Sequence, residues 1–162
     1  MERLLFSETE NSWSILNILE HIVLSEEASL AYVLKKTSVV ADLKPISVKS
    51  WLKIWLMKLV LQFKVKYKAP KHVDPIKSTI TDIKELTLRW ENSRDVLYDI
   101  SQLSPRILEK GILKHPYAGM LNFSQLLVFF ETHFEHHLVQ INHLVELDQQ
   151  QLGVRLSPIR VK

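Results

Sequence analysis

Three of the seven histidines in the chain fall within the five residues from His133 to His137. On an α-helix, side chains four residues apart lie one above the other, so His133 and His137 would face the same way. Two imidazoles at this spacing are suited to binding one divalent ion. The alternative is a pair of buried polar residues satisfied by water or by neighbouring groups. A metal site would also need a third ligand from elsewhere in the chain.

Helical angles divide the residues around this pair. At about 100° per residue, His133, His137 and Gln140 lie on one mostly apolar stripe. His136 lies at the edge of the stripe and His143 lies further round the helix. We therefore expect His133 and His137 to point inward, Gln140 to hydrogen-bond near them or to cap the core, and His136 to lie at a rim.

His21, near the other end of the chain, is the third candidate ligand. It is one of the few ionisable residues on the inward side of an apolar helical pattern, between Ile18 and Leu24. A single histidine on an apolar helix face is more often a satisfied core residue than a ligand. From the residues alone, both interpretations of His21 stay open.

Four long helical patterns must position these side chains, because apolar residues recur at helical spacing in four segments. Ser14 and Asn122 are suited to cap the first and the last of them, and Trp13 is placed to contact Ile18. No convincing strand pair is found, and residues 104–121 are expected to form a loop. The predicted helices cover residues 14–34, 47–67, 76–103 and 123–149.

The predicted fold is all-α, an antiparallel four-helix bundle whose sites are built from inward side chains of facing helices. It carries an extra basic helical segment, residues 47–67, between the first long helix and the helix at 76–103. Residues 1–149 are predicted to form the domain and residues 150–162 a tail.

Composition limits the chemistry. With 162 residues and a mass of 19.0 kDa, the chain fits one domain. The sequence contains no cysteine, which excludes disulfides, thiolate ligands and a cysteine nucleophile. A metal site must therefore use His, Asp or Glu. The amino-terminal residues do not resemble a secretory signal, so a cytoplasmic protein is expected.

The basic segment suggests a different class of function. Residues 44–77 hold nine lysines and one acid, Asp74. Such a segment could lie on an anionic membrane surface, although its lysines oppose stable insertion. We prefer a helix packed in the bundle or at a dimer interface, with the lysines extending into solvent. Nucleic-acid binding is not expected, because a recognition motif and arginines are absent from the segment.

Three stretches of the sequence resemble the DinB-like superfamily, also called DinB/YfiT-like, of metal-dependent four-helix-bundle proteins. They are WSILNILEHIVLSE from Trp13, KAPKHVDP from Lys68, and HPYAGMLNFSQLLVFFETHFEHHLVQI from His115. The resemblance spans about residues 10–147. Its most specific parts are Trp13 with His21, the turn from His115 to Leu121, and the His133/His137 pair followed by Gln140-Ile141.

The resemblance implies that His21, His133 and His137 hold one metal ion. Three protein ligands with an open fourth position are typical of a catalytic rather than a structural site. Imidazole ligands suit zinc and nickel, which are the ions expected. Side chains expected near the site or at the rim of its pocket are His136, Gln140, His115, Tyr117 and Glu27.

The resemblance further implies a bacterial enzyme in which the ion activates water or a low-molecular-weight thiol, as in a thiol S-transferase or a hydrolase. A small-molecule substrate and a homodimer are expected. The alternative is a non-catalytic helical interaction or membrane-surface module with vestigial histidines. No general base is assigned, because helix carboxylates are usually at the surface, and this applies to Glu20, Glu27, Glu131 and Glu135.

Overall fold

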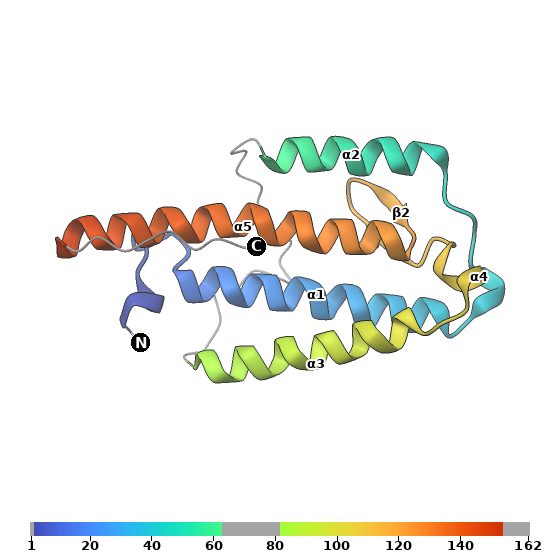
Figure 1. Ribbon diagram of the computed structural model, residues 1–162, viewed down its shortest axis with the longest axis horizontal. Helices are drawn as coiled ribbons and strands as arrows, with labels where there is room; N and C mark the ends of the chain where they lie inside the picture. The colour runs from blue at the N-terminus through green and yellow to red at the C-terminus, as the bar shows by residue number, and fades with distance from the viewer. Residues whose placement is uncertain (1, 63–81, 154–162) are drawn as a thin grey trace.

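The computed structural model describes residues 2–62 and 82–153, and these are mostly helical (Figure 1). The all-α prediction is confirmed. In chain order the elements are η1 (Glu2–Leu5), α1 (Ile15–Thr37), η2 (Val40–Asp42), α2 (Val48–Gln62), α3 (Ile83–Ser101), α4 (Pro105–Leu108), β1 (Leu113–His115), β2 (Gly119–Leu121) and α5 (Phe123–Leu152), where η marks a short 3₁₀ helix.

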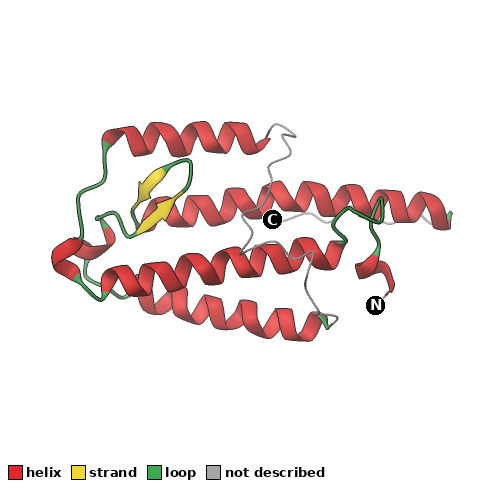
Figure 2. Cartoon of the chain, turned by 180° about the vertical axis from the view of Figure 1, so that it is seen from behind, coloured by secondary structure: helices red, strands yellow, loops and turns green. Residues whose placement is uncertain are grey.

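The long helices lie side by side, with α1 and α5 adjacent and running in opposite directions (Figure 1). Helix α1 also contacts α3, and α2 contacts α5 on the other side of the row. Figure 2 shows the same arrangement from behind, with the small hairpin between α2 and the start of α5. The α1–α5 pair therefore brings residues from the two ends of the sequence together.

Reciprocal caps fix the starts of the two central helices. The Ser14 hydroxyl accepts a hydrogen bond from the Asn17 backbone at 3.2 Å, and Asn17 Oδ1 accepts one from the Ser14 backbone at 3.1 Å. At α5, Asn122 Oδ1 accepts from the Gln125 backbone at 2.9 Å, and Gln125 Oε1 accepts from Asn122 at 3.2 Å. Both caps satisfy amides that have no partner inside their helix, as predicted for Ser14 and Asn122.

Three helix boundaries differ from the prediction by three or more residues. Helix α1 continues to Thr37, three residues beyond the predicted end at residue 34. Helix α3 begins at Ile83 rather than at residue 76, because Asp82 is extended and its carboxylate accepts a hydrogen bond from the Lys84 backbone at 2.9 Å. Residues 76–81 lie outside the described residues. Helix α5 continues to Leu152, three residues beyond the predicted end, and stops at Gly153, whose φ of 66° is left-handed.

The prediction that residues 104–121 form a loop is wrong in part, because this range contains α4 and an antiparallel hairpin. Leu113 pairs with Leu121, and His115 pairs with Gly119, whose φ is 82°. Both leucines are buried. Each strand has only three residues, which is too short to give a clear alternating pattern in the sequence.

The basic segment forms a helix over Val48–Gln62, and the rest of the predicted span up to residue 67 lies outside the described residues. Helix α2 packs on α5 and on strand β2. Within the two described ranges, no helix has both the length and the apolarity needed to cross a membrane.

Two apolar clusters hold α1 against α5. One joins the later part of α1 to the start of α5 and the hairpin, through residues such as Leu30, Val33 and Phe130. The other joins the start of α1 to the later part of α5, through Ile18 and Ile141 among others, and Trp13 packs against it. On α5, His133 and His137 lie between the two clusters, so apolar packing on both sides fixes their position.

We predict that Asn122→Ala lowers the free energy of unfolding by about 1–2 kcal/mol. The substitution removes a buried cap and leaves the backbone N–H of Gln125 without its acceptor. Urea denaturation would measure the loss. Ser124→Ala, at an exposed position in the same first turn, is the control and should change stability little. Equal losses of stability in the two variants would contradict a stabilising role of the Asn122 cap.

Candidate metal centre

The three predicted histidines come together between α1 and α5. The Nε2 atoms of His133 and His137 are 3.1 Å apart on adjacent turns of α5, and their rings are nearly perpendicular, at 87°. The ring of His21, from α1, has its centroid 4.8 Å from that of His137 and 5.2 Å from that of His133. One ligand atom from each residue lies within 4.8 Å of the other two. The arrangement could hold a metal ion.

Aromatic side chains pack against this cluster. The ring of Trp13 lies 4.9 Å from that of His21, and Phe129 stacks on His133 at 5.5 Å with 27° between the planes. His21 and His137 are buried, and His133 is half-buried. The contact with Phe129 was missed from the sequence, although Phe129 lies four residues before His133 on the same helix and was therefore a candidate neighbour.

Gln140 determines how the His137 ring is protonated. Its Oε1 lies 2.9 Å from His137 Nδ1, and its Nε2 lies 3.1 Å from His136 Nε2. An amide oxygen only accepts, so His137 Nδ1–H donates to it, and an amide nitrogen only donates, so His136 Nε2 accepts. His137 thus keeps its proton on Nδ1 and its Nε2 lone pair turns toward His133.

Burial keeps the ligand pair uncharged. Desolvation lowers the pKa of His137 to about 3, and electrostatic interaction with neighbouring His21 lowers it further. Desolvation also lowers the pKa of His133 well below its usual value, and the adjacent His137 adds to the effect. Both rings are therefore neutral at pH 7, which is the form that binds metal ions.

The donor set fits a divalent ion. Two imidazole nitrogens bound tetrahedrally to zinc, each about 2.0–2.1 Å from it, lie roughly 3.3 Å apart. The 3.1 Å between the Nε2 atoms of His133 and His137 is close to this separation. The hydrogen bond from His137 Nδ1 to Gln140 is of the kind that orients histidine ligands in metal sites.

His115 shapes the hairpin rather than joining the cluster. Its Nδ1 accepts hydrogen bonds from the backbone amides of Tyr117 at 3.2 Å and Ala118 at 3.1 Å, so it closes the turn. Its ring meets Phe129 edge-on at 4.6 Å, and burial lowers its pKa to about 4. Tyr117 is exposed at the turn. His115 is thus connected to His133 through the ring of Phe129.

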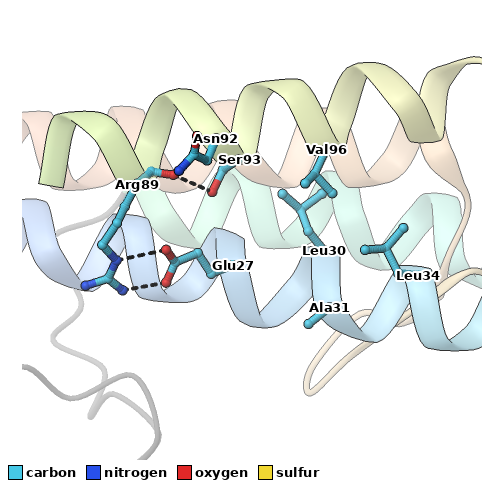
Figure 3. A pocket seen from close by; sticks show the side chains of 8 residues that line it. All are labelled: Glu27, Leu30, Ala31, Leu34, Arg89, Asn92, Ser93 and Val96. Atoms are coloured by element: carbon cyan, nitrogen blue, oxygen red, sulfur yellow. Dashed lines mark hydrogen bonds and ion pairs between the residues drawn. The ribbon is translucent and has the colours of Figure 1, made fainter. Parts of the chain in front are cut away.

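Glu27 lies on a different face of α1, against α3. It pairs with Arg89, whose Nε donates to Glu27 Oε1 at 2.9 Å. The two side chains lie at one end of a pocket between α1 and α3 (Figure 3). None of the three clustered histidines lines this pocket. The structure therefore associates Glu27 with helix packing and not with the histidine cluster.

Two carboxylates of α1 are buried, against the expectation that helix acids lie at the surface. Glu20 is 4% exposed and Glu26 is 2% exposed. Glu26 accepts a hydrogen bond from Trp90 Nε1 at 2.9 Å and pairs with Arg94. Glu26 is buried while Arg94 reaches it from an exposed position, so removing Trp90 or Arg94 would leave the buried carboxylate with one partner fewer. These contacts join α1 to α3. Glu131 and Glu135 are exposed, as expected.

The fold and the site together define a class, an all-α protein with a three-histidine cluster that could hold a metal ion. The comparison with protein families makes this specific. A family model described as the DinB superfamily matches residues 1–141, and the chain belongs to this superfamily of metal-binding proteins. We found no significant match among curated proteins or solved structures. The KAPKHVDP stretch, at residues 68–75, lies outside the described residues.

We predict that the metal-free protein loses stability as the pH falls from about 6.5, the usual histidine pKa, toward 3. The pKa of His137 is lowered in the folded state, so unfolding takes up a proton in this range. Each such histidine contributes a slope of about 1.4 kcal/mol per pH unit. Urea denaturation at several pH values with a chelator present would measure it.

His137→Gln should make this pH dependence shallower, since it removes a titrating group and keeps a polar side chain. His143→Gln is the matched control on the exposed side of α5. An unchanged slope in His137→Gln would contradict the buried neutral state of His137.

Proposed function

We propose that the protein is a metal-dependent enzyme in which His21, His133 and His137 bind one divalent ion, zinc or nickel. The observation that carries the proposal is the convergence of three imidazoles from two helices, with His137 oriented by Gln140. A structural zinc site normally has four protein ligands, and three leave a position for a reactant.

The chemistry follows from this ligand set. A bound divalent ion would act as a Lewis acid. It would lower the pKa of a water or thiol bound to it toward neutral pH. The chain has no cysteine, so a thiol would be a low-molecular-weight cosubstrate. Thiol S-transfer to a small electrophile, or hydrolysis, is the reaction proposed.

The residues of the chain have distinct parts in this proposal. Trp13 and Phe129 pack against His21 and His133 and restrict the access of water to the cluster. Gln140 keeps the proton of His137 on Nδ1, away from the site. The low pKa of His137 keeps its Nε2 available as a ligand well below neutral pH.

We also propose that the four long helices form an antiparallel bundle around this site. The support is that α1 and α3 run in one direction and α2 and α5 in the other (Figure 1), with α1 packed on α5, α3 on α1 and α2 on α5. In this arrangement the site lies on the central pair of helices, where apolar packing holds its ligands most firmly.

We predict that protein purified without a histidine tag binds about one zinc or nickel ion per chain, measured by elemental analysis and by competition with a coloured chelator. His133→Ala should weaken binding by more than the roughly 10–100-fold typical of losing an outer hydrogen-bond partner, because it removes a ligand. His21→Ala and His137→Ala should do the same.

His143→Ala is the matched control, since His143 lies on the exposed side of α5 and outside the cluster. The metal affinity of His143→Ala should equal that of the unchanged protein. The proposal fails if no stoichiometric ion is found and if neither zinc nor nickel raises the melting temperature.

We predict that Gln140→Leu lowers metal affinity by about 10–100-fold, because His137 loses the acceptor that fixes its proton on Nδ1. Gln140→Glu retains an acceptor at this position and should keep most of the affinity. Chelator competition on both variants, with melting temperatures of the metal-free forms as a check on folding, makes the comparison. Equal affinities of the two variants would show that the hydrogen bond has no role in binding.

A further inference from the structure

Helix α2 has an exposed apolar surface at the outer edge of the helical row. Its buried residues, Ser50 and Ile54, lie four apart and mark the side that packs on the protein. Four large apolar side chains on its other sides are more than half exposed. They are Trp51 at 51%, Leu52 at 66%, Trp55 at 59% and Leu56 at 53%.

These four residues form a continuous strip, which we call the α2 strip. At about 100° per residue, Leu52 and Leu56 lie nearly opposite the buried pair, and Trp51 and Trp55 lie beside them. Scattered exposed apolar residues are normal, but a contiguous group of large ones marks a surface that contacts something. Two tryptophans beside two leucines is the combination favoured where an apolar phase meets water.

Positive charge borders the strip. Lys49 and Lys53 are exposed and lie on the flank of α2 next to the leucines, opposite the tryptophans. Residues 43–62 contain four lysines and no acidic residue. A partner for this surface must therefore be apolar in the middle and negatively charged around it.

Pairing with a second copy of the strip fits these charges poorly. Two copies related by a twofold axis would bring like surfaces together. The lysines of one copy would approach those of the other, without acids on α2 between Val48 and Gln62 to pair with them. An anionic lipid surface supplies both the apolar layer and the negative charge.

We propose that the α2 strip is a peripheral membrane-binding surface that docks on anionic lipid. Leu52 and Leu56 enter the boundary between headgroups and acyl chains, while Trp51 and Trp55 lie at its level. Lys49 and Lys53 contact the lipid phosphates. This binding is independent of the histidine cluster, which lies between α1 and α5.

The test is flotation of the full-length protein with vesicles of phosphatidylcholine alone and of phosphatidylcholine mixed with phosphatidylglycerol. We expect binding to the mixed vesicles to be roughly tenfold stronger or more, and weaker at high salt, because several lysines face the surface. Tryptophan emission should shift to the blue on binding. The shift should be absent in Trp51→Phe/Trp55→Phe, in which only Trp13 and Trp90 remain.

Matched variants separate the contribution of the α2 strip to vesicle binding from the effect of similar substitutions elsewhere on the surface. Trp51→Ala/Trp55→Ala should reduce binding to the mixed vesicles about tenfold or more, whereas Leu88→Ala/Tyr98→Ala, at exposed positions of α3, should not. Lys49→Glu/Lys53→Glu should abolish the preference for anionic vesicles. Lys35→Glu/Lys84→Glu, also exposed but on α1 and α3, is its control and should leave most of the preference. His137→Ala should bind vesicles as the unchanged protein does.

Equal binding to the two kinds of vesicle, or undiminished binding by Trp51→Ala/Trp55→Ala, would overturn the proposal. The proposal would also be overturned if the unchanged protein bound no vesicles and light scattering showed a dimer that Trp51→Ala/Trp55→Ala converts to a monomer. The α2 strip would then bind a second copy of the chain. Vesicle binding by a protein that takes up no metal would support the strip while refuting the metal site.

Discussion

The structure depends on burying uncharged imidazoles between two antiparallel helices. A buried ring nitrogen needs a partner, and a buried charged ring is disfavoured, so the positions available to these side chains are few. His133 and His137 turn their Nε2 atoms toward each other, and Gln140 accepts the proton of His137. A slip of α1 along α5 by one turn, about 5.4 Å, would remove His21 from the pair. Everything that fixes the register of these helices therefore supports the site.

Several contacts fix that register. The caps at Ser14 and Asn122 determine where α1 and α5 begin. The apolar clusters on either side of the histidines resist sliding, because side chains from both helices interlock in them. The contacts of the buried Glu26 carboxylate with Trp90 and Arg94 join α1 to α3 from the other side. Helix α1 is thus held on two faces, by α5 and by α3, and His21 lies on the face that packs on α5.

Much of this arrangement could be predicted from the sequence because it follows helical geometry. The angles on α5 separated the inward His133 and His137 from His136 and predicted that Gln140 lies near them. The caps were readable because they depend on residues three positions apart. His21 alone was ambiguous, since nothing local distinguishes a ligand from a core histidine, and the resemblance to a family linked it to the others.

What the sequence did not reveal depends on contacts between distant segments or on very short ones. The hairpin has three-residue strands, so its pairing gives almost no periodic signal. The start of α3 was misplaced because Asp82 caps that helix, a role that many other acids in the chain could have had. The burial of Glu26 depends on Trp90 and Arg94, which are more than sixty residues away in the chain.

The ring contacts from His115 to Phe129 and from Phe129 to His133 have a consequence for how the protein can vary. His115 is held on two sides, by hydrogen bonds from two backbone amides of its own turn and by a T-shaped contact with the Phe129 ring. A residue inserted in that turn would move the His115 ring, and the stacked rings would transmit the movement to His133. The length of this turn is therefore constrained by the packing of rings inside the protein, whereas most surface turns are free to lengthen.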